Sequence, residues 1–76
     1  MEDRIKKVIQ NMLNNDSDID SNADLKVYGV DSLAKVQLLV DLEDEFGIEF
    51  EEDDINQNNF SSVLTIKETI GKYITK

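Results

Sequence analysis

The residues best suited to chemistry lie in the run Gly29-Val30-Asp31-Ser32-Leu33. A polar connection ends there and the most apolar stretch, residues 33–46, begins, so Ser32 is predicted at a helix start. Free backbone N–H groups and the helix dipole at such a position favour an anion on the serine oxygen. Ser32 is therefore a candidate for carrying a phosphate. The simpler interpretation is that its hydroxyl only caps the helix.

Other catalytic chemistry has little support in the composition. The chain has no Cys and no His, so it lacks a thiolate and the commonest general base and metal ligand. A hydrolase built on Ser32 is disfavoured, because Asp31 is adjacent in sequence and cannot face Ser32 on a helix. We therefore expect a protein that is not an enzyme and receives its chemistry from outside.

A calcium site is the alternative that the spacing of acids suggests. Asp16, Asp18 and Asp20 alternate as in a calcium-binding loop. Ser21 stands where such a loop needs glycine, and Val27 stands where it needs a bidentate glutamate. We expect no metal site, and an acidic calcium-binding or regulatory helical module stays open as the second function.

The negative charge is concentrated in one stretch. The formal net charge is −9, and hydrophobic residues make up 39% of the chain, enough for a small folded domain. Between Val36 and Ile66 there are nine acids and no Lys or Arg, which equals the whole net charge. This stretch repels nucleic acid and anionic lipid and favours proteins with basic patches, although a merely solvated face would look the same.

The periodicity predicts an all-α fold, a small four-helix bundle with three main helices and one short helix. The first helix is expected at about residues 2–14, and a long loop over residues 15–31 follows it. A short helical turn is expected at residues 51–55, and the last helix should begin at Ser61 or Ser62. Apolar residues assigned to the core are Ile5, Val8, Ile9, Met12 and Leu13, then Ile19, Leu25, Val27 and Tyr28 as loop anchors, and Val63, Ile66, Ile70 and Ile74 with Tyr73 beside them.

The second main helix carries two apolar stripes, although one suffices for a core. At 100° per residue, one stripe is Leu38, Leu39, Leu42 and Phe46, and the other is Leu33, Val36 and Val40. The second stripe is expected to be partly exposed beside Ser32, with an acidic rim. A left-handed Gly47 should end the helix.

The length favours a single domain over residues 1–76. The sequence shows no apolar run of the signal-peptide type at its start and no run of about 20 apolar residues that could span a bilayer. We therefore expect a cytoplasmic protein without stable membrane insertion.

The run Tyr28-Gly29-Val30-Asp31-Ser32-Leu33 resembles the Leu-Gly-x-Asp-Ser-Leu motif of the acyl and peptidyl carrier proteins. The resemblance extends over almost the whole chain, through the long loop and the acidic second helix. Tyr28 and Val27 depart from the pattern, as does a longer link at residues 56–60. These departures look more like free-standing carriers of peptide-synthetase, polyketide or D-alanine type than like fatty-acid carriers.

The resemblance implies that a phosphopantetheinyl transferase attaches a 4'-phosphopantetheine arm from coenzyme A to Ser32, flanked by Asp31 and Leu33. Acyl or aminoacyl groups would then be carried as thioesters for fatty-acid, polyketide or nonribosomal peptide biosynthesis. The expected partners are an acyl- or aminoacyl-loading enzyme and a downstream synthase or transferase with basic docking patches. The chain is expected to be a monomer that does not bind nucleic acid. The expected partner-binding residues are Leu33, Val36, Val40, Asp41, Glu43 and Asp44.

Overall fold

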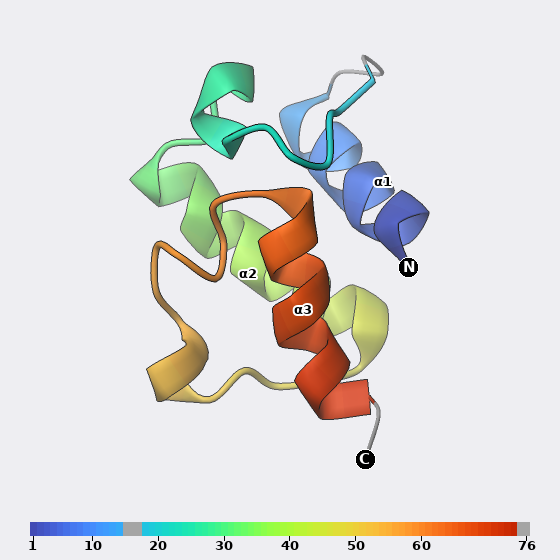
Figure 1. The fold of residues 1–76 in the computed structure, drawn as a ribbon, viewed down its shortest axis with the longest axis vertical. Helices are drawn as coiled ribbons and strands as arrows, with labels where there is room; N and C mark the ends of the chain where they lie inside the picture. The colour runs from blue at the N-terminus through green and yellow to red at the C-terminus, as the bar shows by residue number, and fades with distance from the viewer. Residues whose placement is uncertain (15–17, 75–76) are drawn as a thin grey trace.

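A computed structural model describes residues 1–14 and 18–74, and within them it contains three α-helices and no strand (Figure 1). The all-α prediction is confirmed. A long loop crosses one end of the molecule between the first two α-helices, and a second connection leads along the other side to the third (Figure 1). In chain order the elements are α1 (Glu2–Leu13), η1 (Leu25–Tyr28), α2 (Ser32–Phe46), η2 (Glu52–Asp54) and α3 (Val63–Ile74), where η marks a 3₁₀-helix.

Helix α1 agrees closely with its predicted range. Glu2 and Asp3 lie in the first turn, where acids interact favourably with the helix dipole. The helix ends at Asn14, which adopts the left-handed conformation with φ 54°. Its buried side chains are those of Ile5, Val8 and Ile9.

Helix α3 begins at Val63, one residue after the later of the two predicted starts, Ser61 and Ser62. The Thr65 backbone N–H donates to the Ser62 hydroxyl at 3.3 Å, and the Ser62 backbone N–H donates to the Thr65 hydroxyl at 3.0 Å. This reciprocal pair satisfies the helix start. Val63, Ile66 and Ile70 are buried, but Ile74 is exposed at the last turn, and its assignment to the core was wrong.

The long loop is fastened to the core by the predicted side chains except one, with Val30 buried in place of Val27. Ile19 and Leu25 are buried, and Tyr28 is partly buried with its hydroxyl accepting the Asp20 backbone N–H at 2.8 Å. Val27 is exposed, and its assignment as an anchor was wrong. The sequence did not predict η1; in this tight turn Leu25 is buried and Val27 is left in solvent.

The second connection contains the predicted short helix as the single 3₁₀ turn η2. Tyr73 of α3 fastens it: the Tyr73 hydroxyl donates to the Asp54 carboxylate and accepts the Glu51 backbone N–H. That hydrogen bond from Tyr73 lowers the pKa of Asp54 below its ordinary value, and Lys72 acts in the same direction. Phe50 packs edge-on against the Tyr73 ring. These contacts fasten η2 and the segment before it to α3.

The core lies between the three α-helices and reaches under both connections. It includes Leu38 and Leu42 of α2 together with Phe50 and Phe60 of the second connection. No helix among the described residues is both long and apolar enough to cross a membrane.

Candidate functional site

Ser32 is the first residue of α2, but it is not the cap. The Asp31 carboxylate accepts the Ala34 backbone N–H at 2.9 Å, and the Asp31 carbonyl accepts the Lys35 N–H at 2.9 Å. Asp31 has the extended backbone that a capping residue needs, with φ −90° and ψ −171°. The interpretation of Ser32 as a simple N-cap was therefore wrong, and its hydroxyl is not needed to start the helix.

The Ser32 hydroxyl also differs from those of the other described serines, each of which makes a hydrogen bond. Ser21 donates to a Glu2 carboxylate oxygen at 2.7 Å, Ser61 donates to the Asn58 carbonyl at 3.1 Å, and Ser62 is part of the α3 cap. Within residues 1–14 and 18–74, Ser32 is exposed and its hydroxyl has no hydrogen-bond partner. Ser17 lies outside the described residues. Ser32 is thus both accessible and unengaged.

The second apolar stripe of α2 lies in solvent, as predicted. Leu33 is 82% exposed, Val36 61% and Val40 51%, whereas Leu38 and Leu42 are fully buried. Three exposed apolar side chains at successive turns of one helix form a strip that begins next to Ser32.

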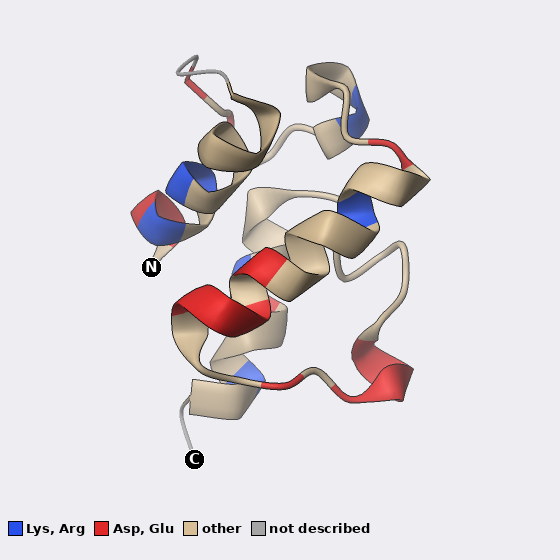
Figure 2. Cartoon of the chain, turned by 180° about the vertical axis from the view of Figure 1, so that it is seen from behind, with Lys and Arg blue, Asp and Glu red and all other residues tan. Residues whose placement is uncertain are grey.

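Acidic residues cluster at the far end of α2 and continue through the second connection to η2 (Figure 2). Asp44 is exposed, and Asp41 accepts a hydrogen bond from the Gln37 amide at 2.8 Å. Glu43 differs, because its carboxylate accepts the Phe50 backbone N–H at 2.8 Å. Glu43 therefore has a structural role in holding the connection, in addition to its charge.

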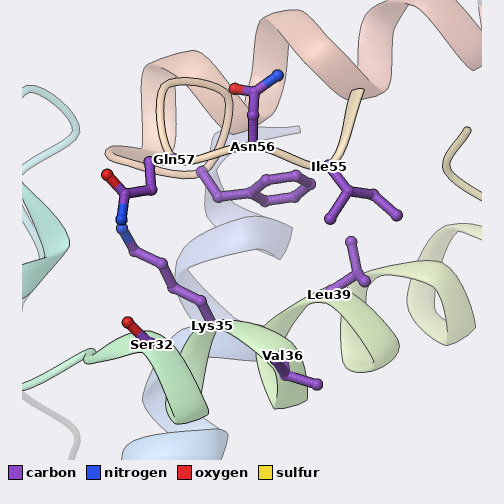
Figure 3. Close-up of a pocket in the computed structure, with 8 residues that line it drawn as sticks. Ser32, Lys35, Val36, Leu39, Ile55, Asn56 and Gln57 are labelled. Atoms are coloured by element: carbon purple, nitrogen blue, oxygen red, sulfur yellow. The ribbon is translucent and has the colours of Figure 1, made fainter. Parts of the chain in front are cut away.

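A groove of about 250 Å³ opens beside Ser32, between α2 and the segment after η2 (Figure 3). Lys35 and Gln57 extend toward one another at the Ser32 end, whereas Val36, Leu39 and Ile55 lie toward the other end (Figure 3). The groove is lined by Ser32, Lys35, Val36, Leu39, Ile55, Asn56, Gln57 and Phe60. The groove therefore combines the Ser32 hydroxyl, the Lys35 ammonium group and an apolar wall.

Residues 3–69 match the family described as "Phosphopantetheine attachment site". The chain belongs to this family. The prosthetic group of these carrier proteins is 4'-phosphopantetheine, as the resemblance implied, and carriers of this kind are not catalytic themselves. The family match identifies the type of group but does not itself select the attachment residue.

Among the relatives of this phosphopantetheine carrier is an aminoacyl carrier protein from Agrobacterium fabrum. It is 38% identical over 52 residues, which are 68% of this chain and 63% of that relative. The matched region thus covers less than two thirds of the relative's length.

Solved structures resemble the carrier over most of its length. One is an engineered Bradyrhizobium japonicum glycine:[carrier protein] ligase complexed with carrier protein from Agrobacterium tumefaciens and AMP. The matching chain is 30% identical with a TM-score of 0.82, over 92% of this chain and 97% of that chain. Another is the B. japonicum ligase with its cognate carrier protein and an analogue of glycyl adenylate, at 27% identity and a TM-score of 0.84, over 93% and 95% of the two chains.

The residues present in this carrier fit the prosthetic group. Attachment needs a hydroxyl that a second protein can reach, and Ser32 meets this condition because it is exposed and makes no internal hydrogen bond among the described residues. Asp31 satisfies the helix start without it, so modification of Ser32 leaves the cap of α2 in place. Ser32 would hold the group, which supplies the thiol that the sequence lacks.

The acidic loop does not assemble a metal site in the part of the chain that the structure describes. No group of three or more candidate ligands occurs there, and the Asp20 carboxylate already accepts the Asn22 backbone N–H at 2.9 Å. Asp16 lies outside the described residues.

Sequence reasoning missed the wall of the groove that Ile55, Gln57 and Phe60 form. No pattern marks these residues, because contacts with both α2 and α3 place the second connection, through Glu43 and Tyr73. Lys35 did carry a signal, since its spacing of three from Ser32 places both on one helix face.

Proposed function

We propose that residues 1–76 form a single carrier domain that bears 4'-phosphopantetheine on Ser32 and presents aminoacyl groups to partner enzymes. The observation that carries this proposal is the exposed hydroxyl of Ser32 at the first position of α2, which has no hydrogen-bond partner among the described residues, in a chain of the phosphopantetheine attachment family.

The part played by Ser32 follows from its chemistry. In the modification, its oxygen bonds to the pantetheine-bearing phosphorus of coenzyme A, and the bond from that phosphorus to the bridging oxygen breaks. Adenosine 3',5'-bisphosphate leaves, and a base on the transferase takes the hydroxyl proton. Asp31 keeps α2 capped throughout, so Ser32 stays at a fixed place on a rigid helix. Once attached, the arm supplies a thiol for carrying the cargo as a thioester.

An aminoacyl cargo is supported by the relatives. One is an aminoacyl carrier protein, and the structural neighbours are complexes of carrier proteins with glycine:[carrier protein] ligases. We infer that an aminoacyl ligase loads this chain and that a transferase receives the cargo. Acyl cargo for fatty-acid or polyketide biosynthesis is the competing outcome of the cargo experiment.

We infer that partners dock on the strip formed by Leu33, Val36 and Val40. The support is its exposure beside Ser32, together with Asp41 and Asp44, which attract basic surfaces. Glu43 contributes to the negative electrostatic potential of this surface, and its carboxylate also accepts a hydrogen bond from the Phe50 backbone N–H. The cytoplasmic location and the monomeric state stay predictions from the sequence.

Modification by a promiscuous phosphopantetheinyl transferase tests the attachment residue. The protein is incubated with coenzyme A and the transferase, and its intact mass is measured before and after. We expect the native chain to gain one phosphopantetheine and Ser32→Ala to gain none. Ser61→Ala is the matched control and should be modified like the native chain. Gain of the arm by Ser32→Ala would overturn the assignment.

The thermal midpoint of Ser32→Ala separates loss of the site from loss of the fold. Since Asp31 provides the cap and alanine is a favourable helix residue, we expect Ser32→Ala to melt at nearly the native temperature.

The intact mass of the protein purified from its native host tests the cargo. A mass increment of phosphopantetheine plus an aminoacyl group supports the aminoacyl assignment. An increment of phosphopantetheine plus a fatty or polyketide acyl group refutes it.

A further inference from the structure

The segment that leads into Ser32 is short and follows η1 directly. Helix η1 ends at Tyr28 and α2 begins at Ser32, so only residues 29–31 lie between them. In Figure 1, η1 and the start of α2 lie at the same end of the molecule. Gly29 turns the chain with φ 91°, and Val30 is fully buried. The shape of the chain immediately before Ser32 therefore depends on how η1 is held.

Tyr28 is the residue of η1 that fastens this segment to the earlier part of the long loop. Its hydroxyl accepts the Asp20 backbone N–H at 2.8 Å, across eight positions of the chain. The Tyr28 side chain is half-buried and packs against the core. Leu, which the motif Leu-Gly-x-Asp-Ser-Leu has at this position, carries no hydroxyl and could not accept this bond. The hydrogen bond is thus a feature of this sequence.

The turn of the loop that Tyr28 reaches is anchored to two helices. Ser21 follows the bonded amide directly, and its hydroxyl donates to a Glu2 carboxylate oxygen of α1 at 2.7 Å. The Ser21 carbonyl accepts the Leu64 backbone N–H of α3 at 3.1 Å. Glu2 also pairs with Lys67 of α3 at 3.2 Å. Tyr28 therefore connects η1 to both α1 and α3 through one turn of the loop.

We propose that Tyr28 is a positioning residue whose hydroxyl holds residues 29–31 in the shape that the transferase recognises when it modifies Ser32. The proposal rests on the proposed function, because it needs Ser32 to be the modified residue. A partner that binds one conformer binds with an apparent affinity reduced by the fraction of molecules in that conformer. Loss of the Tyr28 hydrogen bond lowers this fraction, so it weakens recognition and leaves the chemical step unchanged.

Helix η1 keeps its other contacts when the hydroxyl is removed. Leu25 is fully buried, and its backbone N–H donates to the Ser61 carbonyl at 2.8 Å. The Asp24 carboxylate caps η1 by accepting the Lys26 backbone N–H at 2.9 Å. Tyr28→Phe also retains the aromatic ring that packs against the core. We therefore expect this variant to keep the fold and to lose only the link to the anchored turn.

Steady-state kinetics of the modification test the proposal. The transferase receives saturating coenzyme A and increasing concentrations of carrier, and intact mass follows the product. Tyr28→Phe should raise KM for the carrier by about two- to fivefold, the range that the loss of one hydrogen bond supports, and should retain kcat. A KM equal to the native value would refute the proposal, and so would a fall in kcat with KM unchanged.

Tyr73→Phe is the matched control. It removes the other tyrosine hydroxyl of the chain, which accepts the Glu51 backbone N–H at 2.9 Å in the second connection. This variant should melt at a lower temperature than the native chain but should retain the native KM. An equal rise in KM in Tyr73→Phe and Tyr28→Phe would show a general effect of stability and would refute a specific role for Tyr28.

Ser21→Ala tests whether Tyr28 acts through the anchored turn. It removes the hydrogen bond from the turn to Glu2 and should also raise KM. Because both changes loosen one link, Ser21→Ala and Tyr28→Phe together should raise KM by less than the product of their separate effects. A rise equal to that product would mean that the two residues act independently, and this route would be refuted.

The outcomes are distinct from those that test the carrier function. If the native chain gains no mass, the carrier proposal itself fails. If the native chain and Tyr28→Phe are both modified with the same KM, the role of Tyr28 is refuted and the carrier proposal stands.

Discussion

The strongest test of the partner surface compares Val40→Ala with Leu42→Ala. The two residues lie two positions apart on α2, and both changes shorten an aliphatic side chain to alanine. Val40 is 51% exposed on the strip beside Ser32, and Leu42 is fully buried in the core. The proposed docking strip therefore gives Val40 a role in binding, whereas burial gives Leu42 a role in stability.

The size of each stability effect follows from this difference in burial. Leu42→Ala removes three buried carbons at about 0.8 kcal/mol each, before the cost of the cavity. The total should fall within about 2–5 kcal/mol. Val40→Ala removes two carbons that are half solvated, a loss of about 0.8 kcal/mol, and the better helix propensity of alanine recovers up to about 0.7 kcal/mol.

Thermal unfolding measures this contrast directly. For a chain of this size, 1 kcal/mol corresponds to a change in Tm of about 4–8 °C. Leu42→Ala should therefore lower Tm by about 10 °C or more, and Val40→Ala by about 4 °C or less. Equal destabilisation by the two changes would show that Val40 belongs to the core, and the docking strip would then be wrong.

The rate of modification measures the binding effect. Val40→Ala should lower kcat/KM of the phosphopantetheinyl transferase by about fivefold or more, which corresponds to about 1 kcal/mol of lost contact. Ile74→Ala is the control, because it also removes exposed apolar surface but lies at the end of α3. An equal loss of rate in Ile74→Ala would refute a specific role for Val40.

Three further predictions concern the cap, the acidic surface and the second connection. Asp31→Ala should lower the free energy of unfolding by about 1 kcal/mol in urea titrations, because it removes the acceptor for the Ala34 N–H; a value near zero would show that Ser32 takes over the cap. Asp44→Lys should slow modification several-fold at low salt and little at about 1 M salt, because exposed charges mainly steer encounter and are screened; slowing independent of salt would contradict this role. Tyr73→Phe should destabilise the domain at neutral pH, because it removes the donor to Asp54. The pKa of Asp54 is lowered in the fold, so this stabilisation is present above the ordinary carboxyl pKa of about 4 and is lost as the pH falls through the folded value. The difference in thermal midpoint between Tyr73→Phe and the native chain should therefore shrink on acidification, and a constant difference would contradict the argument.

The sequence by itself determined the helices and the place of Ser32. Apolar spacing of three and four residues identifies each helix, and Gly47 marks the end of α2 because it can adopt the left-handed conformation, with φ 63°. These signals are local, since they depend on neighbours within one or two helical turns. The two apolar stripes of α2 were also visible, and three helices need only one of them for a core.

The tertiary structure alone decided which groups meet around Ser32. Whether Asp31 or Ser32 caps α2 depends on the path by which the long loop enters the helix, and that loop is fixed by a hydrogen bond from the Leu25 N–H to the Ser61 carbonyl at 2.8 Å. Gln57 and Lys35 line one groove because Glu43 and Tyr73 fasten the second connection to α2 and α3. Contacts between residues so distant in sequence follow from packing and leave no periodic pattern in the chain.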